Sequence, residues 1–217
     1  MHILHILDHS IPVQDGYSYR SLALLRGQHA LGWKTSHLTS AKHGEGPGIV
    51  ETVDGFEFHR TAPERGLLAR LPLAGQFSFI TGMQKRLDEL IPKLQPDVLH
   101  AHSPALNGVA AVKAGRKHGL PVVYEVRGFW EDAAVDNGTV KEGDLRYRAT
   151  RAMETWVLKR ADQVTCICEG LRADIAERGI PTAKITVIPN GADPTNMSER
   201  GTPAPELLKK FGLEGKT

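Results

Sequence analysis

The strongest constraint on the fold is an alternation, along the whole chain, of short apolar runs with segments of helical length. Residues 2–7 form the first apolar run, and residues 16–31 form a helical segment that is followed by Gly32. Short apolar strands separated by helices indicate a parallel β-sheet that is covered by helices on both faces. We therefore expect an α/β protein.

The same alternation predicts the remaining elements. Residues 51–60 hold Asp54-Gly55 between two β-like runs, which predicts a small hairpin. Residues 62–75 are expected to be irregular, and residues 128–143 to form a long polar loop. Further strands are expected at 34–39, 97–102, 121–126, 163–168 and 184–188, and further helices at 76–94, 104–118, 144–160 and 171–178.

The end of the chain differs in composition from the rest. Residues 193–205 are rich in Pro, Thr, Ser and Gly, which is typical of a linker, and a new helical turn begins near residue 206. We expect one domain over residues 1–192, followed at 193–217 by a linker and the start of a further domain.

Charge and cysteine usage exclude several classes of protein. The net charge is +2 over 217 residues, and no basic run occurs, so nucleic-acid binding is not indicated. Cys166 and Cys168 are the only cysteines, and we expect no disulfide between them; their spacing is not that of a zinc site, so a reducing, cytoplasmic location fits.

The sequence gives no sign of a targeting or membrane-spanning segment. The first residues lack a basic start and a cleavage site, and no apolar stretch reaches 18 residues. Residues 65–93 mix apolar and basic side chains, so they fit either a peripheral contact with the inner face of an anionic membrane or a helix that packs on its own sheet. We prefer the second interpretation.

Polar, aromatic and ionisable side chains collect directly after the strands, where open parallel sheets bind ligands. A hydrophobic core does not require such side chains there, so this edge of the sheet is the candidate site. The residues that we single out are Gly16, Tyr17, His102, Arg127, Trp130, Glu131, Glu169 and Asn190.

Arg127 is the most informative of these residues. A cation directly after an apolar strand either pairs with an acid or faces an anion such as a diphosphate, and we favour the ligand. Glu131 and Asp132 suit general base work. They equally fit the solvated start of a loop or partners of Arg127, and we prefer these simpler interpretations.

The two histidines of the strand at 97–102 have the same parity, so His100 and His102 share a face. A histidine at a strand end is either solvated or functional, and His102 lies nearer the loop. A metal site would need a third ligand, and the sequence identifies none, so we predict no metal.

The first loop offers a second point of ligand approach. Gly16 lies at a strand-to-helix turn, where backbone amides and the helix dipole can receive an anion. No G-x-G-x-x-G motif is present, so a dinucleotide fingerprint is absent. Tyr17 and Tyr19 fit either stacking on a sugar or packing on the sheet.

Three stretches in order resemble the N-terminal domain of the family 4 glycosyltransferases, which have the GT-B architecture. They are DVLHAHSP at 97–104, LPVVYEVRGFWED at 120–132 and KITVIPNGAD at 184–193. Many members have two adjacent glycines where this chain has Asp15-Gly16, and many have a histidine where it has Arg127. Arg127 with Trp130 and Glu131 resembles the subgroup that makes bacterial surface polysaccharide.

The resemblance implies a Rossmann-like domain that binds the acceptor and faces a second domain that binds the nucleotide-sugar. The implied activity of the full-length protein is sugar transfer, with retention of configuration, from a nucleotide-sugar to a glycan or lipid-linked acceptor, without a further cofactor. Arg127 would stabilise negative charge, His102 would position a sugar hydroxyl, and Gly16 would admit the ligand to the backbone.

Two alternatives remain. One is half of a GT-B nucleotide-sugar epimerase, which would use a different set of carboxylates and histidines. The other is a non-catalytic sugar- or lipid-binding module, because fold alone does not determine function.

Overall fold

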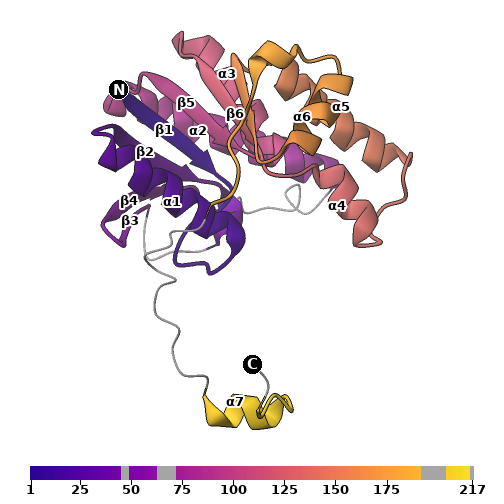
Figure 1. Ribbon diagram of the computed structural model, residues 1–217. Helices are drawn as coiled ribbons and strands as arrows, with labels where there is room; N and C mark the ends of the chain where they lie inside the picture. The colour runs from indigo at the N-terminus through magenta and orange to yellow at the C-terminus, as the bar shows by residue number, and fades with distance from the viewer. Residues whose placement is uncertain (45–48, 63–71, 192–203, 216–217) are drawn as a thin grey trace.

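The computed structural model describes residues 1–44, 49–62, 72–191 and 204–215 and contains one eight-stranded sheet (Figure 1). The strand order is β3-β4-β2-β1-β5-β6-β7-β8, and every neighbouring pair is parallel except β3 with β4. The strands are β1 His2–Leu7, β2 Lys34–Thr39, β3 Val50–Val53, β4 Phe56–Arg60, β5 Val98–His102, β6 Val122–Val126, β7 Gln163–Cys166 and β8 Ile185–Val187. The expected α/β fold and the hairpin at 51–60 are confirmed.

Helices cover both faces of the sheet. Helix α1 lies beside β2 on one face, and α2, α3 and α5 pack against one another in sequence on the other face. Their bounds are α1 Gly16–Ala30, α2 Pro72–Leu94, α3 Ala105–His118, α4 Trp130–Asp136, α5 Leu145–Arg160, α6 Glu169–Glu177 and α7 Pro205–Lys210.

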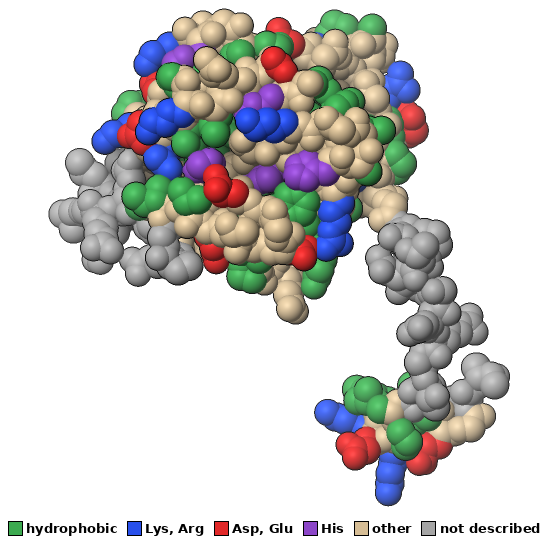
Figure 2. All heavy atoms as spheres, turned by 90° about the vertical axis from the view of Figure 1, so that its left-hand side faces the viewer, with side chains coloured by type: hydrophobic (Ala, Val, Ile, Leu, Met, Phe, Trp, Pro, Cys, Tyr) green, Lys and Arg blue, Asp and Glu red, His purple; other side chains and the backbone are tan. Residues whose placement is uncertain are grey.

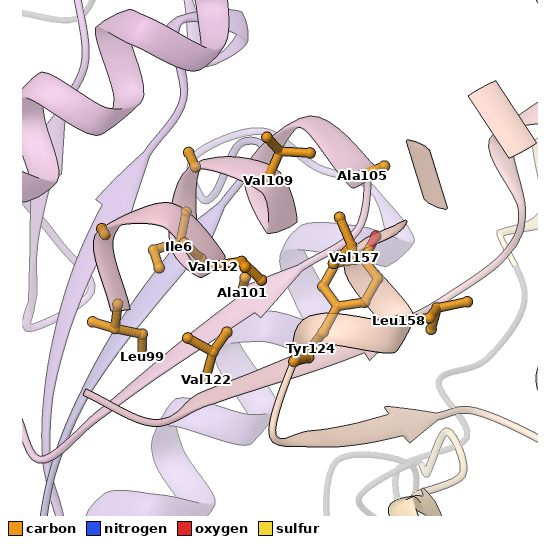
Figure 3. Packing of buried hydrophobic residues seen from close by; sticks show 14 of the residues in the cluster. Ile6, Leu99, Ala101, Ala105, Val109, Val112, Val122, Tyr124, Val157 and Leu158 are labelled. Carbon is orange, nitrogen blue, oxygen red and sulfur yellow. The ribbon is translucent and has the colours of Figure 1, made fainter. Parts of the chain in front are cut away.

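The larger hydrophobic cluster lies between the sheet and the α2–α3–α5 layer (Figure 3). Ile6, Leu99 and Tyr124 point into it from the strands, and Val112 and Val157 meet them from α3 and α5. A smaller cluster, which includes Leu22 and Leu25, lies under α1. Fully burying one such side chain contributes roughly 1.5–3 kcal/mol.

Glycine permits the close seating of α3. A Cβ atom added at Gly108 would lie 2.5 Å from Val157 Cγ1 and 2.9 Å from the ring of Tyr124. Helix α3 therefore approaches both α5 and the sheet at a distance that a larger residue would not allow.

Three expectations about local structure are wrong. The expected loop at 128–143 contains α4, whose charged residues Glu131 and Asp132 begin the helix at its favourable end. Helix α2 begins at Pro72, inside the stretch expected to be irregular, because proline is well tolerated in a first turn. Strand β7 ends at Cys166, and α6 begins at Glu169, two residues before the expected start.

The stretch at 65–93 packs on its own sheet where it is described. Ile80, Met83 and Leu87 of α2 are buried in the larger cluster, whereas residues 65–71 lie outside the described residues. The expected linker at 193–205 lies almost entirely outside them too. None of the helices in the described ranges combines the length and the apolar character that crossing a bilayer requires.

Candidate functional site

Arg127 leaves the carboxyl end of β6 and is held by five groups of the protein. Its guanidinium contacts Glu125 Oε1 at 2.6 Å and the Tyr17 carbonyl at 2.8 Å, and it lies 4.1 Å from the centre of the Tyr17 ring. It also donates to Ser21 Oγ at 3.1 Å and to His102 Nδ1 at 2.7 Å. With 10 % of its side chain exposed, Arg127 is a fixed positive charge that reaches the surface at the carboxyl edge of the sheet.

The acid that pairs with Arg127 is Glu125, rather than Glu131 or Asp132. The side chain of Glu125 is fully buried, and Oε1 also accepts from Arg20 Nε at 3.0 Å. Burial acts to raise the pKa of this carboxyl, but the positive charge of Arg127 outweighs it and holds the pKa well below its usual range. Two arginines around one carboxylate leave a surplus of one positive charge at this edge.

Arg20 connects this ion cluster to the chain after β8. It donates to the carbonyls of Ile188 at 2.9 Å and Pro189 at 3.2 Å, and to Asn190 Oδ1 at 2.9 Å. Arg20 and Glu125 were not predicted from the sequence, because one lies inside a helix and the other inside an apolar strand. The signal for Glu125 was its place in VVYEV, since a carboxylate in a buried strand requires a partner.

Four histidines lie under α1 on one face of the sheet. Register pairs His5 with His37 on one side and with His100 on the other, while His102 lies two residues further along β5. This confirms that His100 and His102 share a face. Other histidines reach the surface on the side that lies at the left of Figure 1 (Figure 2), but these four are at most 9 % exposed.

Hydrogen bonding fixes the protonation of two of these rings. Because arginine only donates, His102 Nδ1 must accept from Arg127, and the neutral ring then carries its proton on Nε2. That proton points at His5 Nδ1, 2.9 Å away, so His5 donates from Nε2 to Gln28 Oε1 at 2.8 Å. Burial, chiefly, lowers the pKa of His102 to about 3, which agrees with a neutral ring.

The positions of the ring protons of His102 and His5 also affect whether these histidines could bind a metal ion. His5 is the third ligand that the sequence did not identify, since ring nitrogens of His5, His100 and His102 lie within 4.8 Å of one another. A cation held at His102 Nε2 would displace the proton to Nδ1, where it would face the Arg127 donor. The nearby arginines also oppose a further cation, so the geometry favours a hydrogen-bonded chain over a metal centre.

His102 is fully buried, and both of its ring nitrogens are bonded within the protein. The direct contact with a sugar hydroxyl that the sequence suggested is therefore not available in this arrangement. Instead, His102 contacts the guanidinium of Arg127 and has no exposed surface of its own.

A pocket of about 350 Å³, which we call the α4–α5 pocket, opens at the carboxyl edge between these two helices and the start of α3. Trp130, 47 % exposed, lines it and also lines a smaller neighbouring pocket of about 180 Å³. Arg127 and Tyr17 form part of the smaller pocket. Three predicted residues, Tyr17, Arg127 and Trp130, therefore meet at one place.

Two buried carboxyls form the inner wall of the α4–α5 pocket. Glu131 is 1 % exposed and forms an ion pair with Arg178 at 2.7 Å, so it is neither solvated nor a partner of Arg127. Glu154 accepts from the hydroxyl of Tyr124 at 2.8 Å, and burial raises its pKa to about 7. Sequence analysis did not identify Glu154, because its long-range partner lies 30 residues away.

The remaining predicted residues lie elsewhere. Gly16 and Asn190 line a separate groove of about 510 Å³ between α1 and the chain after β8. A Cβ at Gly16 would meet nothing within 4 Å, so the backbone is open to approach. However, Asp15 caps the helix by accepting from Ser18 N at 2.8 Å, which places a carboxylate where an anion would bind. Glu169 is exposed and pairs with Arg172, and neither the α4–α5 pocket nor the groove includes it.

The chain matches a known protein family. The profile of the family described as "Glycosyl transferase 4-like domain" matches residues 15–191, which include all the elements from α1 to β8. A search of curated proteins found no match.

Solved structures share the fold at low sequence identity. Sucrose-phosphate synthase from Thermosynechococcus elongatus has a TM-score of 0.71 and 17 % identity, with 98 % of this chain and 52 % of that chain covered. The lipopolysaccharide outer core galactosyltransferase WaaB gives 0.61 and 14 %, with 89 % and 46 % covered. UDP-GlcNAc 2-epimerase from Methanocaldococcus jannaschii gives 0.54 and 12 %, with 87 % and 45 % covered. The chain thus spans about half the length of these proteins, and the likeness shows the shared GT-B half-fold alone.

Proposed function

Because the chain belongs to the family of glycosyl transferase 4-like domains, we propose that it is the acceptor-side domain of a retaining glycosyltransferase. The full-length protein would move a sugar from a nucleotide-sugar to a glycan or lipid-linked acceptor in polysaccharide biosynthesis. The observation that supports this best is the meeting of Arg127, Trp130 and the α4–α5 pocket at the carboxyl edge of the sheet.

The α4–α5 pocket has the chemistry that binds a sugar ring. The half-exposed indole of Trp130 offers an apolar face, and Asn137, Thr139 and Thr150 offer donors and acceptors for hydroxyl groups. The pocket also lies within the usual size range of small-ligand sites. We assign it to the acceptor.

Arg127 supplies the electrostatic part of the reaction. Departure of a nucleotide diphosphate builds negative charge, and a fixed cation stabilises that charge without reorganising during the step. Glu125, the Tyr17 carbonyl and Ser21 already hold the guanidinium in place. In this proposal His102 is a positioning residue that acts through Arg127. The surplus positive charge of Arg20 and Arg127 over Glu125 faces the donor or the acceptor.

The donor would bind mainly to the second domain of the full-length enzyme. We therefore expect no turnover by residues 1–217 alone, and sugar transfer by this chain would contradict the proposal. Acceptor binding, in contrast, should be retained by this domain.

The acceptor assignment is tested by saturation-transfer NMR with a series of free mono- and disaccharides. We expect transfer to at least one saccharide and its loss in Trp130→Ala. The matched control is Trp33→Ala, at a tryptophan that is 36 % exposed and outside the α4–α5 pocket. Equal signals from wild type and Trp130→Ala, or no signal from any saccharide, would refute the assignment.

A further inference from the structure

Helix α5 lines a different hollow on each of its two flanks. Its inner flank contributes Tyr147, Thr150 and Glu154 to the α4–α5 pocket. Its outer flank forms a shallow groove of about 460 Å³, whose lining includes four cations: Arg148, Arg151, Lys159 and Arg160. The helix therefore joins the proposed acceptor pocket directly to a basic surface.

Among the residues that the structure describes, no acid pairs with the cations of this outer flank. The helix carries five cations and one acid, and that acid, Glu154, is buried on the inner flank. The four groove cations are exposed, and within the described ranges no carboxylate lies at ion-pair distance from any of them. Such a surface attracts an anionic partner.

Helix α2 differs from α5, because its acids pair with neighbouring cations. On α2, Arg86 pairs with Glu89 at 2.7 Å, and Asp88 takes Lys117 and His118 of α3 at the same distance. Its apolar side chains pack inward on the sheet. The described part of the stretch at 65–93, for which membrane contact was the less preferred interpretation, therefore has acids that pair with neighbouring cations and apolar side chains that pack on the sheet.

Apolar groups accompany the cations of α5. Leu145 at its first turn is 83 % exposed. Trp156 is partly buried, and the guanidinium of Arg160 lies 4.4 Å from its ring. Basic side chains together with a tryptophan and an exposed leucine suit the headgroup region of an anionic bilayer.

We propose that the outer flank of α5 binds the surface of an anionic lipid bilayer. A nucleic acid is the less favoured partner, because the whole chain carries a net charge of only +2 and the four groove cations all lie on one helix. Docking through this flank brings the α4–α5 pocket, on the other flank of the same helix, close to the membrane surface. The inference stands without the proposed transfer reaction, since it rests on the charge and exposure of α5.

Co-sedimentation with vesicles tests the proposal. The probes are vesicles of phosphatidylcholine alone and of phosphatidylcholine with 30 % phosphatidylglycerol, at 50 mM and 500 mM NaCl. We expect binding only to the anionic vesicles, and its loss at high salt. The double variant Arg148→Glu/Arg151→Glu should bind the anionic vesicles at least about 30-fold more weakly than wild type, because each cation contributes a factor of about five to the affinity.

The matched control is Lys85→Glu/Lys93→Glu, which changes the net charge equally at two exposed positions of α2. It should bind as wild type does, and circular dichroism should show that both double variants are folded. Absence of wild-type binding to anionic vesicles at low salt, or an equal loss in the control, would overturn the proposal. So would binding to a duplex DNA probe without binding to vesicles. None of these results would affect the acceptor assignment, which the saccharide experiment tests separately.

Discussion

Replacing Glu125 with glutamine should destabilise the protein more than any other single change at the site. The carboxylate is fully buried between the guanidiniums of Arg20 and Arg127, at 3.0 and 2.6 Å. Glutamine keeps the shape and one acceptor oxygen but removes the charge. Two arginines, each with 10 % of its side chain exposed, would then repel each other without a counter-ion.

The magnitude follows from the loss of one partner in a buried ion cluster. Removing one partner of such a cluster costs about 3–5 kcal/mol, because the remaining charge stays desolvated. That amount is a large fraction of the roughly 5–15 kcal/mol that stabilises a typical protein. The variant should still fold at low temperature, with a clearly lower midpoint of unfolding.

Urea denaturation at pH 7, followed by circular dichroism, measures this change. The matched control is Glu154→Gln, at an equally buried glutamate whose pKa is already raised to about 7 by burial. Glutamine there keeps an acceptor for Tyr124 and removes little charge, so its effect should be far smaller. A Glu125→Gln variant as stable as wild type would refute the assignment of Glu125 as the counter-ion of both arginines.

The pH dependence gives an independent check. The pKa of Glu125 is depressed in the folded protein, so its contribution to the free energy of unfolding is complete above the ordinary value near 4.5. That contribution is lost as the pH falls below this value. The difference between wild type and Glu125→Gln should therefore be constant from pH 6 to 8 and shrink below pH 4.5.

Three further results are expected. Because the pKa of Glu154 is raised to about 7, the free energy of unfolding of wild type should fall by on the order of 1–3 kcal/mol relative to that of Glu154→Gln as the pH rises from 4.5 to 7. Urea denaturation measures this difference, and a difference that does not change with pH would contradict the prediction. Gly108→Ala should lower the free energy of unfolding by about 1–3 kcal/mol, because its Cβ would lie 2.5 Å from Val157 Cγ1. Gly27→Ala, whose Cβ would meet nothing within 4 Å, should raise it by up to about 1 kcal/mol. Equal effects at both glycines in thermal denaturation would count against the close packing of α3. In the full-length enzyme, Arg127→Lys should lower kcat by about 10²-fold or more with a smaller effect on KM, because lysine cannot keep the same contacts while stabilising charge. An unchanged kcat in a transfer assay would show that Arg127 has no role in the reaction.

The strands were the most predictable part of the fold. Each of the central strands is an apolar run whose side chains are buried on both faces, so the pattern appears in the sequence without knowledge of its neighbours. Helix α4 was missed because only seven residues form it and most of them are polar or small, which leaves no apolar periodicity to detect.

The candidate site was predictable only in part. Arg127 and Trp130 follow β6 directly, so their position at the edge of the sheet followed from local sequence. Glu125 and Arg20 were not found, because their pairing joins residues 105 positions apart, and neither stands out within its own element. His5 illustrates the same limit: it meets His100 through the register of β1 with β5, which no local pattern specifies.

Arg20 also sets where this domain can be cut for expression. The last strand ends at Val187, which makes that residue the obvious place to stop a shortened gene. Such a product would discard Ile188, Pro189 and Asn190, the acceptors for both terminal nitrogens of Arg20. A product that stops at Gly191 keeps all three. The stable unit therefore extends four residues past its last strand.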